Sequence, residues 1–158
     1  MRRIDKLLNE YGESHQNQTN KSIHWICVPL IFFSVVGLIA SIPAGPVAAV
    51  TGDGLFANWA AVALVLVTIY YTTLSVALSV GMFLWALLCL YVANLITIAD
   101  IAPLWLASLL IFAAGWIGQF YGHKIEGKKP SFLKDLQFLL IGPAWLMHFI
   151  YKRVGISY

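Results

Sequence analysis

The residues best able to do chemistry in this chain are its four histidines. They are His15, His24, His123 and His148. Imidazole is the commonest protein ligand for iron, zinc and copper. Two of the four lie near the N-terminus and two in the C-terminal third of the chain. A site that used all of them would therefore have to bring the N-terminal and C-terminal regions of the chain together. Its geometry depends on the helices in those two regions.

Amide and carboxylate side chains accompany the histidines at helical spacing. Asn20 lies four residues before His24, and Gln119 lies four residues before His123, so each pair shares a face if both segments are helical. Such amides would orient the imidazole rings, and ordinary hydrogen bonding between helices is an equal alternative. Glu126, three residues after His123, is a candidate to support the site or to ligate a metal if the helix continues. Gly127 indicates instead that the helix ends here, which would leave Glu126 at a solvated helix end.

The composition indicates that these residues belong to a membrane protein. Of 158 residues, 60% are hydrophobic and 11% are charged, with a mean hydropathy of +0.80, whereas soluble domains carry about a quarter charged residues. All ten lysines and arginines lie in residues 1–21 or 124–158. Between those regions the only formal charges are Asp53 and Asp100. No basic helix is apparent, so we expect no nucleic-acid partner.

The uncharged central section predicts four transmembrane helices. Residues 23–42 would span about 30 Å as a helix, which matches one crossing. Residues 55–99 carry no charge and are too long for one crossing, so they must fold back, with a turn expected within residues 72–81. The approximate spans are residues 23–42, 55–74, 78–99 and 103–122.

The number of spans and the charges predict the same orientation. Four crossings place both termini on one side of the membrane, and the positive-inside rule makes that side cytoplasmic, with ten basic residues against none. Asp53 and Asp100 would then lie in loops on the far side. We expect a multi-pass protein of a bacterial inner membrane, or of the endoplasmic reticulum in a eukaryote. All four histidines would lie at the cytoplasmic edge.

The two ends of the chain predict further helices. An apolar stripe at helical spacing predicts an amphipathic helix that ends near Gly12 and lies on the membrane surface; it consists of Ile4, Leu7, Leu8 and Tyr11. Residues 136–151 are apolar but short, and basic residues flank them on both sides. They predict a re-entrant or buried segment, broken at Gly142-Pro143, that carries His148. The fold class is thus a single all-α membrane domain over residues 1–158, built on a four-helix transmembrane bundle.

Four imidazoles at one edge of the bundle predict a metal site that also attaches the polar termini to the membrane helices. The candidate ligands are His15, His24, His123 and His148. The alternative is that these histidines are separate interfacial anchors. Both interpretations stay open on the residues alone.

Two longer motifs resemble the signatures of a membrane enzyme family. The first runs from Tyr11 to His24 with Pro29 following, and the second runs from Gly115 to Pro130. The family, once classed as a domain of unknown function, includes the fungal endoplasmic-reticulum enzyme that shortens 2-hydroxy fatty acids by one carbon during phytosphingosine breakdown. The likeness covers nearly the whole chain.

The resemblance implies an Fe(II)-dependent dioxygenase that takes a 2-hydroxy fatty acid and O₂ and releases CO₂ and the acid one carbon shorter. The family's functional histidines map onto His15, His24 and His123, whereas many relatives carry a glutamate in the region of His148. Three protein ligands on an octahedral iron leave two positions for the hydroxyl and carboxylate of the substrate and one for O₂.

The main alternative is a non-catalytic membrane scaffold or lipid-binding protein with a structural zinc clasp of histidines. Haem binding by two histidines has no supporting motif. A homo-oligomer is compatible with the sequence.

Overall fold

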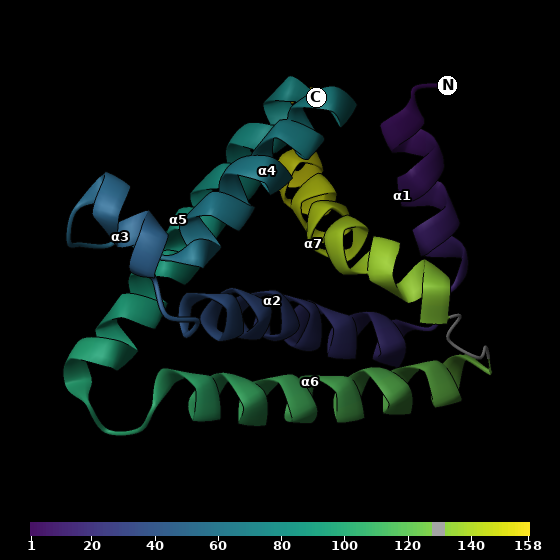
Figure 1. Ribbon diagram of the computed structural model, residues 1–158. Helices are drawn as coiled ribbons and strands as arrows, with labels where there is room; N and C mark the ends of the chain where they lie inside the picture. Colours follow the sequence, from purple (N-terminus) through teal and green to yellow (C-terminus); the bar gives the residue numbers. More distant parts are fainter. Residues whose placement is uncertain (128–131) are drawn as a thin grey trace.

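The computed structural model describes residues 1–127 and 132–158, and every element in those ranges is an α-helix (Figure 1). The predicted all-α class is therefore confirmed. Lys128, Lys129 and Pro130, which end the second motif, lie outside the described residues. The helices are α1 Arg3–Glu13, α2 Gln18–Ala40, α3 Gly45–Thr51, α4 Trp59–Leu74, α5 Val76–Ala99, α6 Leu104–Glu126 and α7 Phe132–Val154.

Three of the described helices, α2, α5 and α6, are long and apolar enough to cross a membrane. They correspond to the first, third and fourth predicted spans. Helix α4 is apolar over its 16 residues, but at about 24 Å it is shorter than the roughly 30 Å hydrocarbon core of a bilayer. The turn between α4 and α5 falls at Ser75, inside the predicted interval, and Ser75 Oγ accepts a hydrogen bond from the Leu78 amide at 3.2 Å.

All the described helices except the short α3 pack in pairs, which form the sides of the molecule in Figure 1. Helix α2 lies antiparallel beside α6, α4 packs on α5, and α1 packs on α7. Helix α2 also contacts α4, α5 and α7. Because it touches a member of every pair, α2 is the element against which the other helices are placed.

Small residues allow α2 and α6 to approach closely. A Cβ atom at Gly118 of α6 would lie 2.5 Å from Cys27 Sγ of α2, and a Cβ atom at Gly122 would collide with Asn20 Oδ1. Glycine at such contacts lets two helix backbones pack at short range. The close approach fixes how the first turns of α2 sit against the last turns of α6.

The predicted amphipathic helix is α1, but its apolar stripe faces protein. Ile4, Leu7, Leu8 and Tyr11 are buried. They form one cluster with Ile141, Ala144, Trp145 and Leu146 of α7. The expectation that this stripe lies on the membrane surface is therefore wrong, because α7 covers it.

The predicted break at Gly142-Pro143 does not occur. Helix α7 continues through Pro143 as one element. Gly142 serves packing instead, since a Cβ atom there would lie 3.0 Å from the Tyr11 hydroxyl oxygen. The segment is buried, as expected, from Ile141 to Leu146. Close contact with α1 and α2 thus explains the glycine that the sequence pattern assigned to a break.

Helix α2 begins at Gln18, earlier than the predicted start of the first span. Asn17 caps it, because its side-chain oxygen accepts hydrogen bonds from the amides of Thr19 at 2.9 Å and Asn20 at 3.3 Å. The early start places Asn20 on the helix, one turn before His24. A short helix, α3, also occupies part of the predicted loop between the first two spans.

Candidate metal centre

Three of the four histidines meet where α1, α2 and α6 converge. His15 lies in the connection from α1 to α2, His24 lies in α2, and His123 lies in the last turn of α6. The ring centroids of His15 and His24 are 4.1 Å apart, and those of His123 lie 5.3 Å from His15 and 5.1 Å from His24. Residues 15, 24 and 123 form what we call the three-histidine cluster.

Backbone carbonyls determine which nitrogen two of these rings present. His15 Nδ1 donates to the Tyr11 carbonyl at 2.6 Å, and His24 Nδ1 donates to the Asn20 carbonyl at 2.9 Å. Because a carbonyl oxygen only accepts, each Nδ1 carries a proton, and the neutral ring keeps its lone pair on Nε2. His24 Nε2 is buried, and no described residue forms a hydrogen bond with it. This is the tautomer of a histidine that binds a metal through Nε2.

The three rings fit a single metal ion. One ligand nitrogen from each ring lies within 4.8 Å of the other two, with His15 and His24 buried and His123 partly buried. Two nitrogens bound to one ion at about 2.1 Å lie at most about 4.2 Å apart, so the ligand atoms already stand close to the required separation. A set of three imidazoles suits iron, zinc or copper.

Two aromatic side chains cover the cluster from the side of α1 and α7. Tyr11 stacks on His15, with ring centroids 4.2 Å apart and an interplanar angle of 11°. Trp145 of α7 lies 5.5 Å from the His15 ring and 5.4 Å from the Tyr11 ring, centroid to centroid. Both aromatic residues are buried. They restrict the orientation of His15 and keep water from that face.

Glu126 connects the end of α6 to the start of α2. Its carboxylate accepts hydrogen bonds from the amides of Gln16 at 2.8 Å and Asn17 at 2.9 Å, and from Asn20 Nδ2 at 3.0 Å. The helix ends at this residue, as predicted, because Gly127 follows with a left-handed φ of 72°. A negative charge at the first turn of α2 is electrostatically favourable. The carboxylate therefore joins the segments that carry the three histidines.

The two amides expected near the histidines lie close to them. Asn20 contacts His24 through its backbone carbonyl, while its side-chain nitrogen donates to the Ser14 carbonyl at 3.2 Å as well as to Glu126. Gln119 is buried in α6, one turn before His123.

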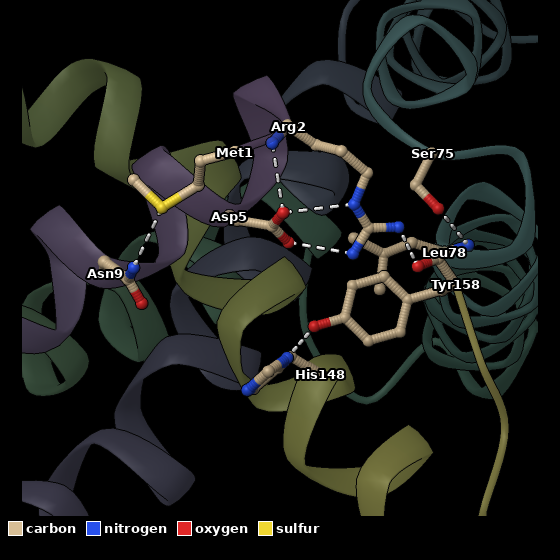
Figure 2. A network of polar contacts seen from close by, with 8 residues as sticks. All are labelled: Met1, Arg2, Asp5, Asn9, Ser75, Leu78, His148 and Tyr158. Atoms are coloured by element: carbon tan, nitrogen blue, oxygen red, sulfur yellow. Dashed lines mark hydrogen bonds and ion pairs between the residues drawn. The ribbon is translucent and has the colours of Figure 1, made fainter.

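His148 does not join the other three histidines. It lies in α7, where its Nδ1 pairs with the hydroxyl of Tyr158, and the Tyr158 carbonyl accepts a hydrogen bond from Arg2 (Figure 2). Arg2 in turn forms an ion pair with Asp5 at 2.8 Å. Burial lowers the pKa of His148, and the positive charge of Lys152 lowers it further. We expected His148 to join the site, but Trp145, one turn earlier in α7, is the α7 side chain that lies beside His15.

Two features of the cluster were not predicted from the sequence. The stacking of Tyr11 on His15 could have been predicted, since the two residues are four apart in the sequence. The contact between Trp145 and His15 could not, because it joins α7 to the connection between α1 and α2.

A family model described as "Mpo1-like: 2-hydroxy-palmitic acid dioxygenase Mpo1-like" matches residues 1–154. The match spans both motifs and all three histidines of the cluster, and it confirms the resemblance drawn from those motifs. No curated protein and no solved structure matches the chain.

Proposed function

Since the chain belongs to the Mpo1-like family of 2-hydroxy-palmitic acid dioxygenases, we propose that it is an iron-dependent membrane enzyme of fatty acid α-oxidation. The reaction is R–CHOH–COOH + O₂ → R–COOH + CO₂ + H₂O. The observation that carries the proposal is the three-histidine cluster, in which residues 15, 24 and 123 bring their ligand atoms within 4.8 Å of one another.

The three imidazoles would hold Fe(II), which would supply the activation of O₂ and the oxidation at carbon 2 of the acid. The Nδ1 contacts of His15 and His24 orient both rings so that Nε2 would be the ligand atom. Tyr11 and Trp145 exclude water on one side. Glu126 holds the end of α6 against the start of α2. Asn20 and Glu126 thus support the histidines without being ligands themselves, and Gln119 lies buried one turn before His123.

An apolar cavity offers a place for the acyl chain. It lies between α2, α4 and α7, and the side chains that line it are all apolar, among them Phe32, Val36 and Leu64. Phe32 is two turns beyond His24 in α2, or about 12 Å along the helix axis. Transfer of an acyl chain from water to such a surface contributes about 0.8 kcal/mol for each buried CH₂ group.

The membrane arrangement of the proposal keeps four crossings and cytoplasmic termini. Lys21 lies in the first turn of α2 and Lys124 in the last turn of α6, next to the three-histidine cluster. Asp53 follows α2 and α3 in the chain, and Asp100 directly precedes the segment that leads into α6. Both therefore lie beyond the ends of α2 and α6 that are opposite the cluster. A polar head group would then bind at the cytoplasmic edge, with its acyl tail among the helices.

Metal analysis of protein purified without oxygen tests the function. We expect about one iron per chain, and O₂ uptake with CO₂ release when 2-hydroxypalmitate is added. The variants His15→Ala, His24→Ala and His123→Ala should each lose iron and activity. His148→Ala is the matched control and should keep its iron, because His148 lies outside the cluster. Firmly bound zinc with no O₂ uptake would refute the proposal and favour the scaffold with a structural zinc clasp.

A further inference from the structure

The side-chain amide of Asn20 has one end fixed and the other end without a partner. Asn20 is fully buried, at 0% exposure. Its Nδ2 donates to the Ser14 carbonyl and to the Glu126 carboxylate, at 3.2 Å and 3.0 Å. Since both groups are acceptors, they determine which end of the amide is the nitrogen. The oxygen, Oδ1, therefore points away from Ser14 and Glu126.

Asn20 Oδ1 lies at the edge of the three-histidine cluster. A Cβ atom at Gly122, the residue before His123, would collide with this oxygen and would lie 3.6 Å from His24 Cε1. The oxygen thus occupies the narrow space between α6 and the His24 ring. No described residue donates a hydrogen bond to it. A buried amide oxygen without a donor is unfavourable, so its position beside the cluster calls for a donor that arrives with a ligand.

A neutral amide oxygen is suited to a hydroxyl group. It accepts a hydrogen bond from an O–H group and does not remove the proton. The substrate class of the proposed function differs from ordinary fatty acids by one such group, on the carbon next to the carboxylate. A site that provides a buried acceptor for this hydroxyl discriminates against the acid that lacks it, because the acceptor is then left without a partner.

We infer that Asn20 Oδ1 accepts a hydrogen bond from the 2-hydroxyl of the bound acid and thereby makes the site select 2-hydroxy fatty acids over unsubstituted fatty acids. This inference rests on the proposed function. Asn20 determines specificity by contact with the substrate and takes no part in bond making or breaking. Gly122 leaves room for the oxygen, since a Cβ atom at that position would collide with it.

Equilibrium binding without O₂ tests the inference independently of turnover. Iron-loaded protein in lipid nanodiscs is titrated with 2-hydroxypalmitate and with palmitate, and the ratio of the two dissociation constants is the readout. We expect the wild type to prefer the 2-hydroxy acid by more than tenfold, because the hydroxyl would also bind the metal, and Asn20→Leu to lower that preference by about tenfold. A purely structural role of Asn20 would change the affinity for both acids equally.

Two further variants test the oxygen separately from the rest of the side chain. Glu126→Gln alters a partner of Nδ2, while the Ser14 carbonyl still accepts from Nδ2 and keeps Oδ1 in place, so the iron-loaded variant should keep the preference. Gly122→Ala leaves Asn20 in the sequence, but its Cβ atom would collide with Oδ1, so it should displace the oxygen and lower the preference. Because Gly122→Ala does not replace Asn20, it gives an answer even if Asn20→Leu does not fold.

The outcomes distinguish this inference from the proposed function. If the wild type binds neither acid, the proposed function fails and the inference fails with it. If the wild type prefers the 2-hydroxy acid and Asn20→Leu keeps that preference, the inference is wrong and the function stands. Loss of the preference in iron-loaded Glu126→Gln, which retains the oxygen, would also overturn it, and so would an unchanged preference in iron-loaded Gly122→Ala, which displaces the oxygen.

Discussion

His15 and His24 are oriented by the backbone of their own segments. Each donates its Nδ1 proton to the carbonyl four residues earlier, on Tyr11 and Asn20 respectively. These contacts are local, so they form wherever the helical turn forms. They orient both rings without any contact with α6. Tertiary structure brings His123 beside these two candidate ligands.

Replacing the Glu126 carboxylate should weaken metal binding without removing a ligand. Glu126→Gln removes the negative charge from the group that accepts hydrogen bonds from Gln16, Asn17 and Asn20. The end of α6 is then held less firmly against the start of α2. We expect about a tenfold loss of iron affinity, measured as iron retained against increasing chelator. Asp53→Asn makes the same chemical change at an exposed position and should have no effect. Equal retention in the two variants would contradict this role of Glu126.

The pairing of α2 with α6 is the packing on which the candidate site depends. One helix carries His24 and the other carries His123, and they approach closely through glycines of α6. A shift of one helix along the other by a single turn, about 5.4 Å, would take His123 out of reach of His24. The same contacts that stabilise the pair therefore also determine the geometry of the cluster.

A double-mutant cycle should detect this close approach. Gly118→Ala adds a methyl group whose carbon would be 2.5 Å from Cys27 Sγ, which is too close for two atoms that are not bonded. We expect it to lower the free energy of unfolding by about 1–3 kcal/mol. In a Cys27→Ala background the sulfur is absent, and the same substitution should cost much less. Thermal or denaturant unfolding of the four proteins in detergent measures the coupling. Strictly additive effects would show that the two positions do not touch.

In the whole molecule, the cluster lies at the ends of α2 and α6 that carry Lys21 and Lys124. All basic residues of the sequence lie in the two terminal regions, 1–21 and 124–158. The C-terminal ends of α2 and α5 lead to loop segments whose only formal charges are Asp53 and Asp100. This asymmetry supports a cytoplasmic site in an inside-positive membrane protein. The 16-residue α4 is the element on which the number of crossings depends.

Cysteine labelling from outside the membrane should define the topology. In a Cys27→Ala, Cys89→Ala background, a membrane-impermeant thiol reagent should label Asp53→Cys and should not label Lys124→Cys until the membrane is permeabilised. Thr73→Cys, at an exposed position near the end of α4, should also stay unlabelled, because in the proposed topology α4 returns the chain to the cytoplasmic side. Labelling of Thr73→Cys from outside would show that α4 does not cross, and labelling of Lys124→Cys would reverse the orientation.

The sequence by itself determined the helical class, the approximate positions of the long apolar helices and the candidate ligands. Hydropathy and helical periodicity are properties of contiguous residues, so the stripe in α1, the turn near Ser75 and the end of α6 at Gly127 could all be predicted. The spacing of Asn20 before His24 was informative for the same reason.

Only the tertiary structure decided which side chains meet. It selected His15, His24 and His123 and left His148 with Tyr158. In the folded chain α7 also covers the apolar stripe of α1, and α7 continues as one helix through Pro143. The Glu126 carboxylate accepts a hydrogen bond from an amide just before α2. Each of these outcomes depends on the register between helices that are far apart in the sequence. Local residue patterns do not encode that register, because it is determined by how closely the packed surfaces can approach.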